Sequence, residues 1–119
     1  MKRKSKQRQP KAFLHSDYLS LISKTKNRGK RSSLIDFANK QQLEAIAECI
    51  ENVLRGNVPL TNTQSKRLAK HKKSMRIISD RKASLPKKKR VLKQEGGFLG
   101  TLIPLAISAL GSLIGGLNN

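Results

Sequence analysis

Lysine and arginine side chains crowd the segment 59–95, which carries thirteen of them against two acids, Asp80 and Glu95. Cations in this number favour a polyanion, either nucleic acid or an anionic membrane surface. Contacts with phosphates position a protein but do not read base sequence. The segment therefore predicts non-specific phosphate binding, and the candidate contact residues are Lys66, Arg67, Lys70, Lys72, Lys73, Arg76, Arg81, Lys82, Lys87, Lys88, Lys89, Arg90 and Lys93.

Residues for catalysis or metal binding are sparse and scattered. His15, Cys49 and His71 are the candidate soft metal ligands, and they lack zinc-site spacing. No nucleophile–base pair, paired carboxylates or phosphate-cradling glycine loop is visible in the sequence. We therefore expect a protein that is not an enzyme and uses no metal or cofactor. Cys49 is interpreted as a small buried helix residue, and His71 as a solvated or phosphate-facing group.

A compact basic cluster follows a proline within this segment, in the order Pro86, Lys87, Lys88, Lys89, Arg90 and Val91. It resembles the single-cluster nuclear import signal of the polyomavirus large tumour antigen, with one lysine fewer before the valine. The alternative is a solvated basic helix face. The two interpretations are compatible, because a phosphate-binding cluster can also act as an import signal.

The stretch from Gly96 to Asn119 contains no charged side chain. Residues 98–117 would be about 30 Å long as a helix, which matches a bilayer core. Large apolar residues share one face and small ones the other, and small faces let helices approach closely. Insertion is marginal, since glycines, serines and Pro104 offset the gain from Phe, Leu and Ile. The candidate membrane or oligomer residues are Ile103, Ile107, Leu110, Gly111, Ile114 and Gly115.

The composition argues against a sizeable core, because aromatics make up 3% of the 119 residues and tryptophan is absent. The net charge of +19 is split by a nearly neutral insert. One cysteine excludes an internal disulfide, and the N-terminus lacks a secretory signal. We expect a largely disordered basic arm at 1–33, an amphipathic helix within 34–58, a basic helical segment at 59–95 and a glycine-hinged apolar tail at 96–119.

The fold class expected is mainly α, with several short helices. The strongest pattern covers 40–55, with an Asn39 cap, an apolar stripe and Gly56 as the stop. Its three glutamates, on the other side, face either water or the chain's own basic segments. Weaker helices are expected at 12–23, from Thr61 or Thr63 towards His71, around 75–78 and from Ser84 to Gly96, with a basic linker at 24–31. These helices could pack on the apolar stripe as a small all-α unit.

A second resemblance covers about residues 85–117. The basic block leads into Gly-Gly-Phe-Leu at 96–99 and Leu-Ile-Pro-Leu at 102–105. This arrangement resembles the precursors of adenovirus core protein X (the mu precursor) and similar proteins of adintovirus and Polinton-type elements. The family's basic part condenses double-stranded DNA in the particle, and a maturation protease cuts such precursors at Leu/Ile-x-Gly-Gly-x. The run 113–117 fits that pattern, so Gly116 and Leu117 are a candidate cleavage site. The preference for Lys over Arg and the neutral insert depart from the family.

The resemblance implies a virion core protein that binds and condenses packaged double-stranded DNA, in the virion and the host nucleus. Its tail would then associate with capsid proteins, membrane or other copies. The alternative is a membrane-active or tail-anchored protein whose basic segment faces anionic lipid. A cellular RNA-binding or ribosome-associated protein also fits the charge, but leaves the apolar tail unexplained.

Overall fold

Helices make up most of the chain that the structure describes. The structure is a computed structural model that describes residues 10–118, and side-chain surroundings as far as Gly111. No strand occurs within these residues, and the mainly helical fold class is confirmed. The elements are α2 (Lys11–Leu14), α3 (Ser16–Lys24), α4 (Arg28–Asp36), α5 (Lys40–Leu54), α6 (Asn62–Ala69), α7 (Lys72–Ser79), α8 (Leu85–Glu95), the 3-10 turn η1 (Gly96–Phe98) and α9 (Leu99–Asn118).

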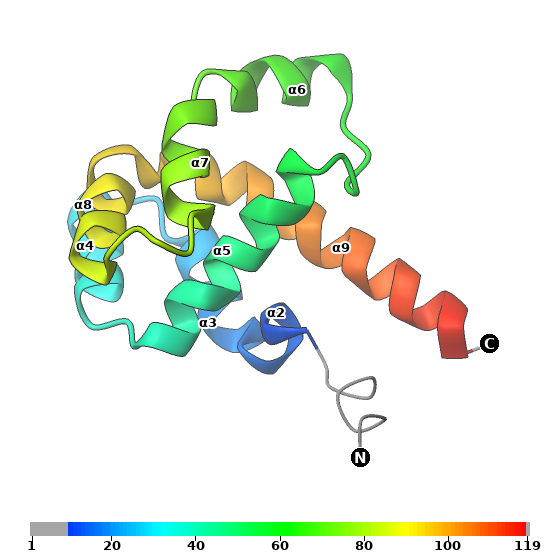
Figure 1. Ribbon diagram of the computed structural model, residues 1–119, viewed down its shortest axis with the longest axis horizontal. Helices are drawn as coiled ribbons and strands as arrows, with labels where there is room; N and C mark the ends of the chain where they lie inside the picture. Colours follow the sequence, from blue (N-terminus) through cyan, green and yellow to red (C-terminus); the bar gives the residue numbers. More distant parts are fainter. Residues whose placement is uncertain (1–9, 119) are drawn as a thin grey trace.

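Helix α5 is the centre of the fold, with α2, α3, α7 and α9 packed against it (Figure 1). Its start is capped reciprocally: the Gln42 backbone N–H donates to the Asn39 side chain at 2.8 Å, and the Asn39 N–H donates to the Gln42 side chain at 3.0 Å. Gly56 follows its end with a φ of 79°, a conformation that glycine adopts without steric cost. The helix predicted at 40–55 is confirmed.

Among the residues whose surroundings the structure describes, twenty buried apolar side chains form one continuous core around α5. The radius of gyration is 14.2 Å, close to the ~13.5 Å expected of a folded chain of this length. The expectation of a small core is therefore wrong. Aliphatic side chains such as Leu19, Ile46 and Leu102 supply the burial that aromatics usually supply.

The apolar C-terminal segment begins inside this core. Phe98, Leu99, Leu102 and Ile103 are buried, and α9 packs between α3 and α5. The approach to α3 is close, because a Cβ at Gly100 would lie 3.2 Å from the Ser23 carbonyl oxygen. The distal half of α9 extends beyond the other helices in Figure 1. Among the described helices, none combines the length and hydropathy that a bilayer crossing requires.

The two glycines at the start of this segment are not a hinge between separate units. They form η1, a tight turn that joins α8 directly to α9. Gly96 is buried, and a Cβ there would lie 3.3 Å from the Arg31 side chain. The physical reason is the burial of Phe98 and Leu99, which holds both sides of the turn against the core.

Residues 10–33 form helices, where a largely disordered arm was expected. Helix α4 begins at Arg28, inside the expected basic linker. Between α3 and α4, the Tyr18 hydroxyl donates to the Leu34 carbonyl oxygen at 3.2 Å. The buried residues of α3 are Leu19 and Ile22, whereas Leu21 is exposed. Contacts with α5 and α9 order this segment despite its charge. Residues 1–9 lie outside the described part of the chain.

The segment 62–95 folds into the expected short helices. Thr61 and Gln64 form the capping box of α6, and the Ser84 hydroxyl accepts from the Lys87 N–H at the start of α8. These caps supply partners for helix-end N–H groups. Each helix then adds a few apolar anchors to the core, and they are Leu68, Met75, Ile78 and Leu92.

Candidate nucleic-acid interface

Ten of the thirteen candidate cations are exposed on consecutive elements, α6, α7, the following loop and the first turns of α8. One of the ten, Arg81, lines a hollow beside α5, and the other nine form one set. Met75 and Ile78 of α7 are buried in the core, so the cations of this helix lie on its opposite, solvent-facing side. Within the described residues, no carboxylate lies within ion-pair distance of these nine. We call this set the basic face: Lys66, Arg67, Lys70, Lys72, Lys73, Arg76, Lys82, Lys87 and Arg90.

The two acids of the segment 59–95, Asp80 and Glu95, each contact a residue of the same segment. The Asp80 side chain accepts from the Lys82 backbone N–H at 2.9 Å. Glu95 lies 3.5 Å from His71 Nδ1, and hydrogen bonds from the Ser74 and His71 side chains lower the pKa of its carboxyl group. The carboxylates of this segment therefore leave the cations of the basic face available to another anion.

His71 serves the fold rather than the basic face. Its ring is half-buried, and its centroid lies 5.1 Å from that of Phe98. Together with its contact to Glu95, this ties the α6–α7 corner to the end of α8. The expectation of a solvated or phosphate-facing histidine is corrected accordingly.

Two of the remaining four cations bind the C-terminal end of α4. The Lys89 ammonium donates to the Asp36 carbonyl oxygen at 2.8 Å, and Lys93 pairs with the Asp36 carboxylate at 2.8 Å. Lysines at such a position satisfy a free helix carbonyl and complement the helix dipole. Lys89 and Lys93 thus hold α8 to α4.

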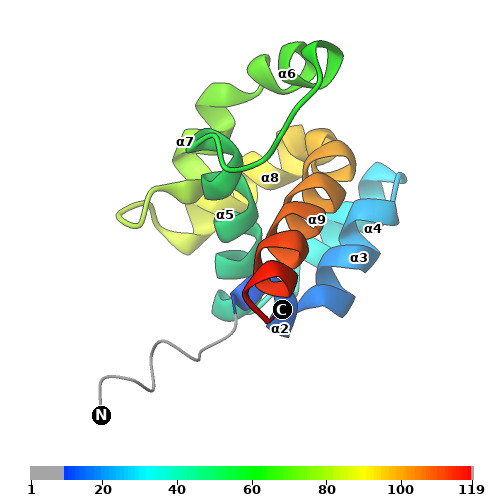
Figure 2. The same ribbon diagram turned by 90° about the vertical axis from the view of Figure 1, so that its right-hand side faces the viewer.

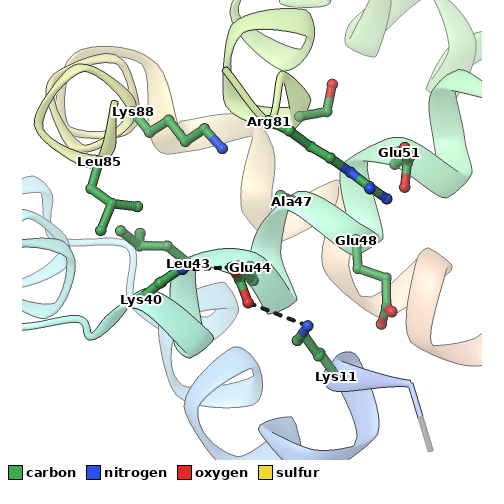
Figure 3. Close-up of a pocket in the computed structure, with 11 residues that line it drawn as sticks. Lys11, Lys40, Leu43, Glu44, Ala47, Glu48, Glu51, Arg81, Leu85 and Lys88 are labelled. Carbon is green, nitrogen blue, oxygen red and sulfur yellow. Dashed lines mark ion pairs between the residues drawn. The ribbon is translucent and has the colours of Figure 1, made fainter. Parts of the chain in front are cut away.

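The other two cations, Arg81 and Lys88, line a hollow beside α5 of about 490 Å³ (Figure 3). Lys88 is only 8% exposed, and its side chain reaches into the hollow from α8. Arg81 reaches across towards Glu51 and Glu48 of α5. Lys88 is therefore withdrawn from the surface, whereas Arg81 is exposed but lines the hollow rather than the basic face.

The glutamates of α5 face the chain's own basic segments at this hollow, which decides between the two alternatives that the sequence left open. Glu44 pairs with Lys11 at 3.3 Å, and Glu48 accepts the Ala12 backbone N–H at 2.8 Å. Glu51 pairs with Arg55 at 3.1 Å. The nearly neutral insert is thus a scaffold that fastens α2 and faces Arg81 of the α7–α8 loop and Lys88 of α8.

The fold places the residues of the import-like cluster, 86–91, in different surroundings. Pro86 begins it in the first turn of α8, and only Lys87 and Arg90 among its cations are fully exposed. Lys88 is buried, and Lys89 is bonded to Asp36. Val91 packs against the core. Helical periodicity thus turns the middle of the cluster inward, so the alternative of a solvated basic helix face holds only for Lys87 and Arg90. The import hypothesis rests on the sequence alone.

The candidate tail residues have different surroundings. Ile103 is a core residue, while Ile107, Leu110 and Gly111 are half-buried. A Cβ at Gly111 would lie 3.7 Å from the Phe13 ring. The side chains of the other candidate tail and cleavage residues, Ile114, Gly115, Gly116 and Leu117, lie outside the described surroundings, although their backbone continues α9.

The structure exposes two features outside the candidate site residues. Lys24, Lys26, Arg28 and Lys30 are exposed near the α3–α4 junction. They belong to the basic linker that the sequence predicts at 24–31. Phe37, just before the Asn39 cap, is also exposed, and nothing in the local sequence pattern distinguishes it from a core aromatic.

Comparison with family models, with curated proteins and with solved structures found no match for this chain. Within the described residues, no group of three or more His, Cys, Asp or Glu side chains is placed to hold a metal ion.

Proposed function

We propose that this protein binds double-stranded DNA through the basic face, by phosphate contacts without sequence preference. The observation that carries the proposal is the separation of charge in the fold. The nine cations of the basic face have no carboxylate partner in the described chain, while other lysines are engaged with α4 and α5. Such a face neutralises phosphates and releases counterions.

The absence of aromatic side chains from α6, α7 and α8 supports a duplex over a single strand. All four Phe and Tyr residues of the chain lie elsewhere in the sequence. Proteins that bind single strands commonly stack bases on aromatic rings. The face is rich in lysine, a flexible point charge that suits an irregular set of phosphates better than bidentate recognition of a base.

The biological setting that we propose is the core of a virion, with the protein condensing packaged DNA and reaching the host nucleus before assembly. This part rests on the resemblance of residues 85–117 to the core protein X precursors. The distal half of α9 would supply the contact with capsid proteins, membrane or other copies. The first half of α9 is unavailable for that role, because it is packed in the core.

The proposal is tested by the salt dependence of binding to a random-sequence DNA duplex. With about seven phosphate contacts, the slope of log affinity against log salt is about −6. Replacing Lys70, Lys73 and Arg76 with Gln should make the slope shallower by about 2–3. The matched control replaces Lys24, Lys26 and Lys30 with Gln, which changes the charge equally outside the basic face and should alter the slope by less than about 1.

Fluorescence anisotropy over a range of salt concentrations measures both variants. Equal changes in slope would show that bulk charge, not the basic face, carries binding. A wild-type slope shallower than about −2 would contradict phosphate binding of this extent. Tighter binding to single-stranded RNA of equal length at the same salt would favour the RNA-binding alternative.

A further inference from the structure

An apolar hollow lies between α3 and α4, away from the basic face. Its volume is about 490 Å³, and its apolar lining comes from Tyr18, Leu21, Leu34 and Phe37. Figure 2 shows α3 and α4 on one side of α9, with α6 and α7 on the other. None of the nine residues of the basic face lines the hollow, although α8, which carries Lys87 and Arg90, packs against α4.

The hollow presents large apolar side chains to solvent. Phe37 is 88% exposed and Leu21 is 53% exposed. Exposed together at one hollow, such side chains are typical of an interaction surface. The floor is preformed, because the Tyr18 hydroxyl is bonded to the Leu34 carbonyl oxygen. Burial raises the pKa of Tyr18 to about 12, so that hydroxyl remains a hydrogen-bond donor well above neutral pH.

The charge around the hollow restricts its occupant. Lys30 lines it, and Thr25, which also lines it, lies between the exposed Lys24 and Lys26. A second copy of this chain, with a net charge of +19, would be repelled here. A DNA duplex presents phosphates but no apolar side chains to fill the hollow. An acidic protein segment with apolar residues complements both the apolar lining of the hollow and the lysines around it.

We propose that the α3–α4 hollow is a docking site for an amphipathic helix of an acidic partner protein. Two large apolar side chains on one face of that helix would enter between Leu21 and Phe37. Its flanking Asp and Glu residues would meet Lys24, Lys26 and Lys30. This is the helix-in-groove mode of recognition, in which anchors at i and i+4 supply affinity and charges supply orientation. The inference stands independently of DNA binding.

The test uses the full-length protein and a synthetic helical peptide with Leu and Phe four residues apart and Glu at its other exposed positions. Two matched peptides replace the Leu–Phe pair with Ala, or every Glu with Lys. Titrations at about 0.3 M salt shorten the screening length to roughly 5–6 Å and so suppress general attraction to the cationic chain. The Leu–Phe peptide should bind at least about tenfold more tightly than either matched peptide.

The protein variants locate the contact. Phe37→Ser should weaken binding about tenfold or more, and Lys30→Gln about two- to fivefold. Leu14→Ser is the matched control, since Leu14 is 59% exposed but does not line the hollow, and it should bind as the wild type does. Because Phe37 is so exposed, its replacement should leave the thermal midpoint of unfolding nearly unchanged.

Four outcomes overturn the inference. They are failure of the Leu–Phe peptide to bind, equal binding by the Ala peptide, wild-type affinity of Phe37→Ser, and equal loss in Leu14→Ser. Sedimentation adds a further check. A dimer of the wild type that Phe37→Ser dissociates would assign the hollow to self-association instead.

Discussion

At the scale of single residues, Cys49 shows how the fold decides chemistry. It lies fully buried in α5, and burial raises the pKa of its thiol to about 12, with a smaller contribution from Glu48. At pH 8 about 1 thiol in 10,000 would be a thiolate, against roughly a quarter for a free cysteine. We predict that Cys49 reacts with a disulfide reagent at least about a thousandfold more slowly in the folded protein than in the unfolded chain.

The absorbance of the released thiol measures this directly, since the chain has one cysteine. Denaturation in guanidinium provides the reference rate and should expose one equivalent. A folded-state rate within tenfold of that reference would contradict the buried position of Cys49.

At the scale of elements, the contact between α7 and the end of α8 predicts a pH dependence. Hydrogen bonds from Ser74 and His71 lower the pKa of Glu95 in the folded protein. A carboxyl group with a lowered folded pKa stabilises the fold above its unfolded pKa, about 4.3. That contribution is lost as pH falls through the folded value. We predict that Glu95→Gln has a lower thermal midpoint than the wild type at pH 6–7, and that the difference shrinks towards pH 3.

Circular dichroism melts at pH 7, 5 and 3 follow this difference. Gln94→Ala is the control, because Gln94 is an exposed neighbour in α8 with no ionisable group. Its effect should be the same at each pH. A difference between Glu95→Gln and the wild type that stays constant down to pH 3 would show that the carboxylate contributes nothing through ionisation.

At the scale of the whole molecule, α9 is part of the core as well as an apolar extension. Ile103 is 1% exposed within the core, so Ile103→Ala removes buried methyl groups and leaves a cavity. We predict a loss of about 2–5 kcal/mol in the free energy of unfolding, a large fraction of the ~5–15 kcal/mol that domains usually have. Urea denaturation followed by circular dichroism measures it.

The exposed Ser108 of α9 provides the control, since Ser108→Ala should change the unfolding free energy by less than about 0.5 kcal/mol. If α9 were a tail tethered to an independent domain, Ile103→Ala would leave the urea midpoint unchanged. That result would restore the glycine-hinged tail that the sequence predicts.

The sequence by itself determined α5, α6 and α8 and most of their ends. The reciprocal caps at Asn39 and Thr61, the Ser84 cap and the stop at Gly56 are all interactions within a few residues. Such contacts are visible in a linear pattern because both partners lie together in the chain. The net charge and the clustering of cations at 59–95 are likewise properties of the sequence, and they identify the class of partner.

Only the tertiary structure decided which of those cations remain available. Lys89 and Lys93 bind Asp36, more than fifty residues away, and Lys88 turns inward. The same holds for α2, α3 and α4, short or charged segments that are helical against a shared core, and for the burial of the first half of α9. Isolated helices of this length are marginal in water. Their order comes from contacts between distant segments, and no local period encodes which segments will meet.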